Sequence, residues 1–160
     1  MSIMDNNVAT INKFYTAFKK LDADAMCSYY SDDIVFFDPA FELLKGSEAK
    51  YMWQMLCKNA KDFSLTYGNI IKLDDEYSTC DWEAHYTFSK TGRKVVNKIR
   101  ANMKFADGKI IEHSDAFSLH KWSAQALGFS GWLLGWNKFF QNKIKNTAKK
   151  NLLNFMQPKA

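Results

Sequence analysis

The chain has 160 residues, of which 47% are hydrophobic, 16% aromatic and 24% charged. This length fits one domain with a sizeable core, and the apolar content excludes a disordered chain, a collagen-like repeat and a small disulfide-stapled scaffold. The formal net charge of +5, from 22 basic and 17 acidic side chains, by itself suggests an acidic partner.

The basic charge is unevenly distributed along the chain. Residues 121–160 contain seven lysines and no acidic residue. The first 120 residues therefore contain 15 basic and 17 acidic side chains, a net charge of −2. The basic character belongs to the C-terminal segment, and the rest of the chain is slightly acidic.

Several common classes of protein have no support in the sequence. Cys27, Cys57 and Cys80 form no CxxC pair, which predicts buried, reduced thiols in a cytoplasmic protein. Residues 1–12 lack the pattern of a signal peptide, and no run of eighteen apolar residues predicts a membrane span. The sequence contains no phosphate-binding glycine motif and no internal repeat, so we expect no cofactor.

The first half of the chain is predicted to be mostly helical. Apolar residues at helical spacing predict three helices, over residues 8–20, 21–30 and 48–59. A short β-rich run at 34–37 lies between the second and third helices. It ends at Asp38-Pro39, because proline cannot donate a ladder hydrogen bond.

The hydrophobic period then changes from helical to alternating. Four antiparallel strands are predicted, over residues 63–73, 77–89, 94–105 and 109–119. Strict alternation would place Phe63, Leu65, Tyr67, Asn69, Ile71 and Leu73 on one face of the first of these. The pattern predicts an α+β fold, with helices on one face of a curved antiparallel sheet.

The C-terminal segment is predicted to be helical again. A short helix over 121–127 ends at Gly128, and one continuous amphipathic helix is expected from Gly131 to Met156. We therefore divide the chain into a domain at residues 1–125 and an appended basic helix at 126–160.

Three sequence segments and one glycine resemble a known superfamily. They are Phe14-Tyr15-x-Ala17-Phe18-x5-Asp24, Tyr30 to Pro39, Gly46, and Gly108 to Phe117. They resemble the nuclear transport factor 2-like superfamily, in its SnoaL-like and ketosteroid isomerase-like subgroup, over about residues 5 to 125. The resemblance implies a cone-shaped roll, with helices packed on a strongly curved sheet.

The resemblance also implies catalytic positions. Asp38 falls where ketosteroid isomerases keep a general-base aspartate, and Asp115 falls where SnoaL-like cyclases place an acid/base aspartate. Ala101 occupies the position of the isomerase oxyanion aspartate. Trp82 and Ala84 occupy the positions of an arginine and an aspartate of limonene epoxide hydrolases. These departures favour cyclase-like chemistry, which depends chiefly on one aspartate with polar support.

The alternation of the strands predicts the lining of a pocket on the concave face of the sheet. The fourth strand would place Ile111, His113, Asp115, Phe117 and Leu119 on that face. We take Asp115, His113 and Asp38 as candidate catalytic residues. Candidate ligand-binding residues are Tyr15, Tyr30, Trp53, Trp82, Tyr86, Asn97, Ala101 and Phe117. A large apolar cavity with few polar groups is typical of a small-molecule site.

Two functions follow from this pocket. The first is a cofactor-free isomerase or cyclase acting on an apolar oxygenated molecule. The alternative is a non-catalytic ligand-binding module, in which Asp115 and His113 are a buried structural pair and Asp38 caps a turn. His113 and Asp115 lack an evident third ligand, so we expect no metal. The polar outer residues Thr79, Asp81, Glu83 and His85 would face solvent or a homodimer partner.

The C-terminal helix has three interpretations. Its apolar stripe could pack on the sheet, the pocket mouth or a partner subunit. It could instead lie on an anionic membrane, with lysines opposite Trp132, Trp136, Phe139 and Phe140. Nucleic-acid binding is the least favoured, because the segment contains no arginine and no recognised module.

Overall fold

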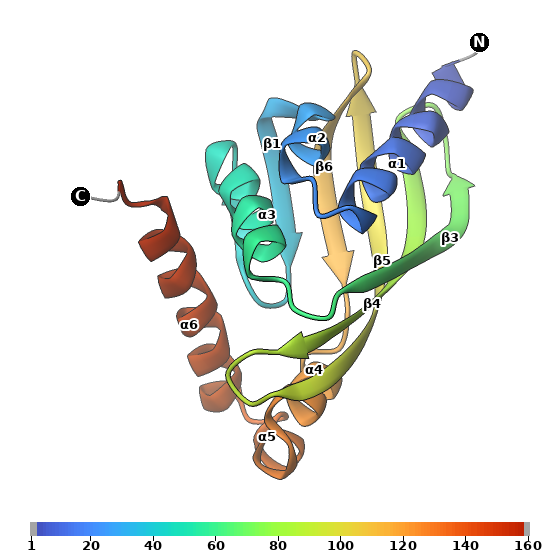
Figure 1. Ribbon diagram of the computed structural model, residues 1–160. Helices are drawn as coiled ribbons and strands as arrows, with labels where there is room; N and C mark the ends of the chain where they lie inside the picture. The colour runs from blue at the N-terminus through green and yellow to red at the C-terminus, as the bar shows by residue number, and fades with distance from the viewer. Residues whose placement is uncertain (1–2, 159–160) are drawn as a thin grey trace.

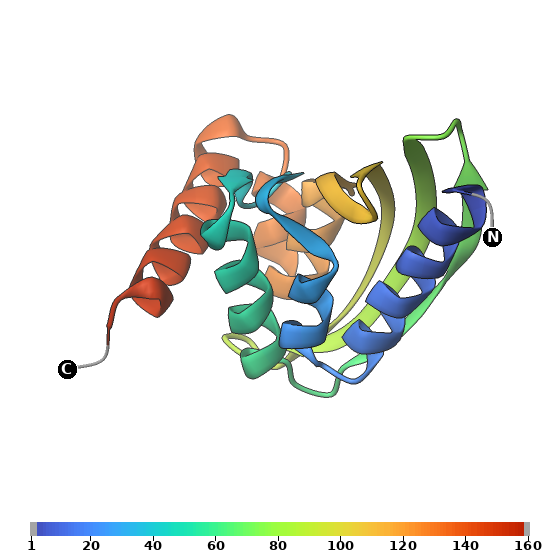
Figure 2. The same ribbon diagram turned by 90° about the horizontal axis from the view of Figure 1, so that it is seen from above.

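The computed structural model describes residues 3–158 as one curved, open sheet with helices packed around it (Figures 1 and 2). The helices are α1 (Ile3–Lys19), α2 (Ala23–Ser28), α3 (Ser47–Asn59), α4 (Leu119–Leu127), α5 (Phe129–Leu134) and α6 (Lys138–Met156). The strands are β1 (Tyr30–Asp38), β2 (Glu42–Lys45), β3 (Ser64–Lys72), β4 (Tyr77–Phe88), β5 (Arg93–Ala106) and β6 (Lys109–Ala116). The predicted α+β roll is confirmed.

The six strands lie in the order β2-β1-β6-β5-β4-β3, and all neighbours are antiparallel except β1 and β6. Helices α1, α2 and α3 cover the concave face (Figure 2). α1 buries Ile11, Phe14 and Phe18 there, as their helical spacing predicts. The core therefore lies between this helical layer and the hollow side of the sheet.

The short strand is longer than predicted, and it has a partner strand that the sequence did not reveal. β1 begins at Tyr30, and β2 returns antiparallel to it after a turn at Pro39. The other edge of β1 lies parallel to β6, where Phe36 is opposite His113. β1 thereby joins the N-terminal part of the chain to the strand that bears the candidate catalytic pair.

The predicted alternation of β3 is wrong beyond Gly68. The pairing of β3 with β4 shifts between Gly68 and Ile71, and Asn69 adopts a left-handed φ of 50°. Such a bulge inserts one residue and exchanges the two faces that follow it. Ile70 therefore packs against the core, whereas Ile71 is exposed.

The last predicted strand also ends early. β6 stops at Ala116, and Leu119 belongs to α4, because the side chain of Ser118 accepts a hydrogen bond from Lys121 N and caps that helix. The register shifts between Lys104 and Phe105. As a result Ile110 is fully buried, whereas Ile111 is only half-buried.

The C-terminal segment is not one continuous helix. α5 ends at Leu134, and α6 begins at Lys138. The side chain of Asn137 accepts hydrogen bonds from the backbone N–H groups of Phe139 and Phe140, which starts a new helix. α6 then lies beside α3 (Figure 1), where Leu152 is buried and Phe155 contacts Tyr51.

Candidate functional site

A chain of hydrogen bonds crosses the core between the helical layer and the sheet. Trp53 Nε1 donates to Tyr30 Oη over 2.8 Å, and Tyr30 Oη lies 2.6 Å from His113 Nδ1. His113 Nε2 lies 2.9 Å from Asp115 Oδ1, which also accepts from Trp82 Nε1 at 3.3 Å. All five side chains are more than nine-tenths buried. The structure thus brings five of the predicted site residues into one network.

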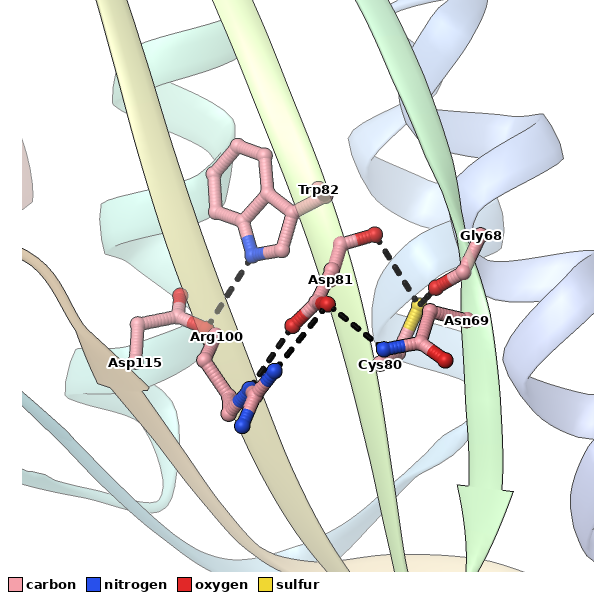
Figure 3. Close-up of polar contacts among 7 residues, drawn as sticks. All are labelled: Gly68, Asn69, Cys80, Asp81, Trp82, Arg100 and Asp115. Atoms are coloured by element: carbon pink, nitrogen blue, oxygen red, sulfur yellow. Dashed lines mark hydrogen bonds and ion pairs between the residues drawn. The ribbon is translucent and has the colours of Figure 1, made fainter.

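The strand pattern explains how these groups meet. His113 and Asp115 are two residues apart on β6, so both point to the concave face. Ala101 of β5 lies directly opposite Asp115, and its methyl side chain leaves space above the strand. Figure 3 shows the indole of Trp82 reaching from β4 across β5 to Asp115.

The donors and acceptors define a direction along the chain. An indole N–H can only donate, so Tyr30 oxygen accepts from Trp53. We assign the proton of the neutral His113 ring to Nε2, because the Asp115 carboxylate beside it can only accept, and Nδ1 then accepts from the Tyr30 O–H. Every donor therefore points toward Asp115, as expected around a carboxylate in a buried site.

Aromatic rings hold the imidazole of His113 in place. The ring of Trp53 stacks near it, with 6.1 Å between centroids, and Phe14 and Phe36 meet it edge-on at 5.7 and 5.2 Å. Phe14 and Phe36 are not among the site residues predicted from the sequence. The β-rich run at 34–37 predicts that Phe36 lies in a strand. It does not predict that this strand pairs with β6, which is what brings Phe36 next to His113.

Asp38 lies at the end of β1 and caps the following turn. Its Oδ1 accepts hydrogen bonds from the backbone N–H groups of Ala40 and Phe41, at 2.9 and 2.6 Å. Burial raises the pKa of Asp38 to about 7, with a smaller rise from the charge of Asp115, and these hydrogen bonds and His113 oppose the shift. A second carboxyl group thus lies within electrostatic range of the His113–Asp115 pair.

Tyr15 is fully buried on α1, and its hydroxyl has no hydrogen-bond partner among the described residues. Its ring lies 6.0 Å from that of Trp82. Burial, together with the charge of Asp115, raises the pKa of Tyr15 well above its ordinary value. The phenol therefore stays protonated and is a donor without a protein acceptor.

Besides Tyr15 and Ala101, three other predicted ligand-binding residues lie outside this network. Tyr86 Oη accepts from Trp122 Nε1 of α4 at 2.7 Å, a partner that the sequence did not indicate. Asn97 and Phe117 are half-buried, and no hydrogen bond joins the side chain of either to His113 or Asp115. Tyr86 of β4 and Asn97 of β5 lie on the parts of these strands that are next to α4.

Two surface hollows lie on the opposite, convex face of the sheet. The larger, of about 560 Å³, includes the groups around Asp81, whose carboxylate pairs with Arg100 at 2.8 Å and accepts from Asn69 (Figure 3). Trp82 contributes to the lining of the larger hollow and His113 to that of the smaller, but neither hollow is lined by Asp38 or Asp115. The ligand cavity expected on the concave face stays a prediction, as does the homodimer contact on the convex face. Within residues 3–158, no three metal-ligating side chains gather into a metal site.

Comparison with known proteins identifies the family. The SnoaL-like domain matches residues 11–113, and the chain therefore belongs to the SnoaL-like family. A comparison with curated protein sequences finds no match to this chain. This membership confirms the resemblance drawn from the sequence.

Several solved structures share the fold at low sequence identity. A proposed polyketide cyclase from Xanthomonas campestris is 18% identical, with a TM-score of 0.66 over 78% of this chain and 99% of that one. A proposed isomerase from Bacillus subtilis is 15% identical, with a TM-score of 0.67 over 80% and 96%. A ketosteroid isomerase-like protein from Catenulispora acidiphila, solved with trimethylamine, is 13% identical, with a TM-score of 0.64 over 73% and 91%. At these identities the likeness shows the fold alone.

Proposed function

We propose that this protein binds an apolar, oxygenated small molecule between its helical layer and the concave face of the sheet, and transfers a proton on it without a cofactor. The observation that supports this most is the buried chain from Trp53 to Asp115, in which every donor points toward one carboxylate. Such a preorganised carboxylate suits general-base catalysis. The SnoaL-like family membership is consistent with it.

In the proposed reaction Asp115 removes a proton from a carbon next to a carbonyl group of the ligand. The negative charge that develops on the carbonyl oxygen requires a hydrogen-bond donor. Tyr15 fits this role, because its buried hydroxyl has no protein partner and its raised pKa keeps it protonated. Protonated Asp115 then returns its proton to another carbon of the enolate, which gives isomerisation. For ring closure, the enolate instead attacks a second carbonyl carbon, and protonated Asp115 donates its proton to the alkoxide that forms.

His113 and Tyr30 position the base in this proposal. His113 holds the carboxylate through Nε2, and Tyr30 holds the imidazole through Nδ1. Asp38 is the second carboxyl group of the site. Its pKa of about 7 lets it exist in either protonation state near neutral pH.

A second function is favoured by the burial of the same residues. Asp115 and His113 are 4% and 1% exposed, and aromatic rings surround them. This arrangement also suits a ligand-binding module that performs no chemistry. The two functions share the binding step and differ in what Asp115 does after it.

The experiment therefore measures binding and proton transfer separately. Binding of hydroxylated naphthoquinones and cyclic β,γ-unsaturated ketones is followed by thermal melting and calorimetry. Proton transfer is followed by NMR as deuterium uptake next to the carbonyl in D₂O, and by absorbance as the conjugated enone forms. The catalytic proposal expects Asp115→Asn to bind normally and to lose roughly a hundredfold or more in rate.

The outcomes separate the two functions. If the wild type binds the probes but takes up no deuterium above the uncatalysed rate, the module without chemistry is supported. If Asp115→Asn keeps the full rate, the assignment of Asp115 as the base is wrong. Asp81→Asn is the matched control, because this carboxylate lies on the convex face and pairs with Arg100.

A further inference from the structure

Helix α5 has the reverse of the usual distribution of side chains. Its buried side contains glycine: a Cβ on Gly131 would lie 1.9 Å from the Ser123 carbonyl oxygen of α4. Gly135, which follows the helix, is also enclosed, because a Cβ there would lie 2.5 Å from His120 Cδ2 and 2.7 Å from Ser123 Oγ. Large apolar side chains point outward instead, since Trp132 and Leu133 are each 57% exposed. A surface helix normally buries such residues.

The outward side chains continue into the start of α6. We call residues 129–139 the elbow. Its four aromatic residues are more exposed than any other aromatic residue in the described part of the chain. They are Phe129 at 74%, Trp132 at 57%, Trp136 at 74% and Phe139 at 82%. Phe140, which the sequence analysis grouped with them, is half-buried. In Figure 1 α5 lies at the bottom, at the far end of the molecule from α1.

Specific side-chain contacts hold the backbone of the elbow in place. The His120 ring stacks on Trp136 with 3.9 Å between centroids, and His120 Nε2 donates to the Trp132 carbonyl at 3.0 Å. Gln141 Nε2 donates to the Gly135 carbonyl at 2.7 Å. The exposed aromatic rings are therefore presented by an ordered backbone.

The charge around the elbow is positive. Lys138 lies next to Phe139. Lys143 lies one helical turn after Phe139, on the same exposed side of α6 as that ring. Two other lysines of α6 are engaged elsewhere, because Lys145 and Lys149 both contact Glu42 of β2. The chain contains no acidic residue after Asp115 to balance this charge.

We propose that the elbow binds the surface of an anionic lipid bilayer. Exposed tryptophan and phenylalanine flanked by lysine match the interface between lipid headgroups and acyl chains. A two-fold contact with a second copy would bring Lys138 and Lys143 of both subunits together without an acidic partner, which is unfavourable. No helix in residues 3–158 is long and apolar enough to cross a bilayer, so the contact is peripheral.

The test uses the full-length chain and vesicles of phosphatidylcholine, with or without 30 mol% phosphatidylserine. We expect co-sedimentation with the anionic vesicles, weakening as salt rises, and a blue shift of tryptophan emission. The double variant Trp136→Ser/Phe139→Ser should lower the vesicle partition coefficient by about tenfold or more. Leu73→Ser, a 58%-exposed residue in the turn after β3, is the matched control and should bind as the wild type does.

A second pair of variants tests the charge. Lys138→Gln/Lys143→Gln should lower binding to the anionic vesicles by about tenfold, with little effect on the weak binding to neutral vesicles. Circular dichroism confirms that each variant is folded.

Three results would overturn the proposal. The first is absence of binding to anionic vesicles by the wild type. The second is equal binding by the elbow variant and by the Leu73 control. The third is a wild-type dimer in sedimentation equilibrium that Trp136→Ser/Phe139→Ser converts to a monomer while vesicle binding is unchanged, which would make the elbow an interface between copies.

Discussion

Trp82 Nε1 donates a hydrogen bond to Asp115 Oδ1 over 3.3 Å, although the two residues lie on strands that β5 separates. The contact exists because Ala101 lies beneath it. Ala101 is opposite Asp115 on one side and opposite Cys80 on the other, and it is fully buried. A larger side chain at this position would occupy the path between the indole and the carboxylate.

Ala101→Leu should therefore destabilise the protein and separate Trp82 from Asp115. We expect a loss of about 1 to 3 kcal/mol, because extra methylene groups in a packed core force its neighbours to move. Urea unfolding monitored by tryptophan fluorescence measures this loss. Ala106→Leu, at the exposed end of the same strand, is the control and should change stability by less than about 0.5 kcal/mol. Equal effects of the two substitutions would contradict the role of Ala101.

Tyr30→Phe should break the hydrogen-bonded chain without changing the packing volume much. The substitution leaves Trp53 Nε1–H and His113 Nδ1 without their partner in the core. We expect a loss of about 2 to 4 kcal/mol, since each buried group that loses its partner costs about 1 to 3 kcal/mol. Thermal and urea denaturation measure it.

Tyr67→Phe is the matched control for that measurement. The Tyr67 hydroxyl bonds to Asn12 in a solvent-exposed contact at 3.0 Å, which water can replace. Its loss should cost less than about 1 kcal/mol. If Tyr30→Phe is as mild as this control, the buried chain contributes little to stability.

Local sequence signals are sufficient to predict strands β4, β5 and β6, which position Trp82, Ala101, His113 and Asp115. The alternation of β5 and β6 alone predicts that Ala101, His113 and Asp115 share one face, and the pairing of Ala101 with Asp115 agrees with it. That inference depends only on a period of two, which the side chains of a regular strand must follow. Asn69 shows where it fails, because a single left-handed residue exchanges the faces beyond it. Glycine within a strand and asparagine are residue types that favour such a bulge, but strict alternation takes no account of them.

The link between Tyr30 and His113 could not be predicted in this way. It depends on the parallel pairing of β1 with β6, two strands that are far apart in the chain. Such a pairing is selected by the whole fold and has no local turn signal. The closure of the core around Asp115 depends likewise on the summed volumes of aromatic rings from several elements. The exposed elbow depends on two glycines whose inward position only the packing of α5 on α4 reveals.

Asp38→Asn should change how stability depends on pH. The folded-state pKa of Asp38, about 7, lies above the ordinary value of 3.8, so the folded protein holds this proton more tightly than the unfolded chain. The stability that this provides is complete below pH 4 and is lost as pH rises toward 7, at about 1.4 kcal/mol per pH unit.

Asparagine keeps an oxygen that can accept from Ala40 and Phe41 but has no charge to bury. We therefore expect Asp38→Asn to match the wild type near pH 4 and to exceed its stability by about 2 to 4 kcal/mol at pH 8. Urea unfolding at both pH values gives the difference between the two proteins. The exposed carboxylates are present in both proteins, so their contributions to the pH dependence of stability cancel in this difference. A constant difference across this pH range would refute the titration of Asp38.

Gly131→Ala tests whether the elbow depends on close packing of α5 against α4. In an unhindered helix this substitution stabilises by up to about 1 kcal/mol, because alanine favours the helix. Here the new Cβ would lie 1.9 Å from the Ser123 carbonyl oxygen and 2.5 Å from its carbon, so the two helices must separate. We expect a loss of about 1 to 3 kcal/mol, seen as a fall in Tm of several degrees.

Gly68→Ala supplies the comparison for this substitution, because a Cβ there meets no atom within 4 Å. It should leave Tm unchanged or raise it slightly. Separation of α4 from α5 should also disturb the stacking of His120 on Trp136, which the fluorescence of the folded protein reports. A Gly131→Ala protein with higher Tm and unchanged emission would show that α5 tolerates a side chain on its inner face, and that the outward display of Trp132 and Trp136 has another cause.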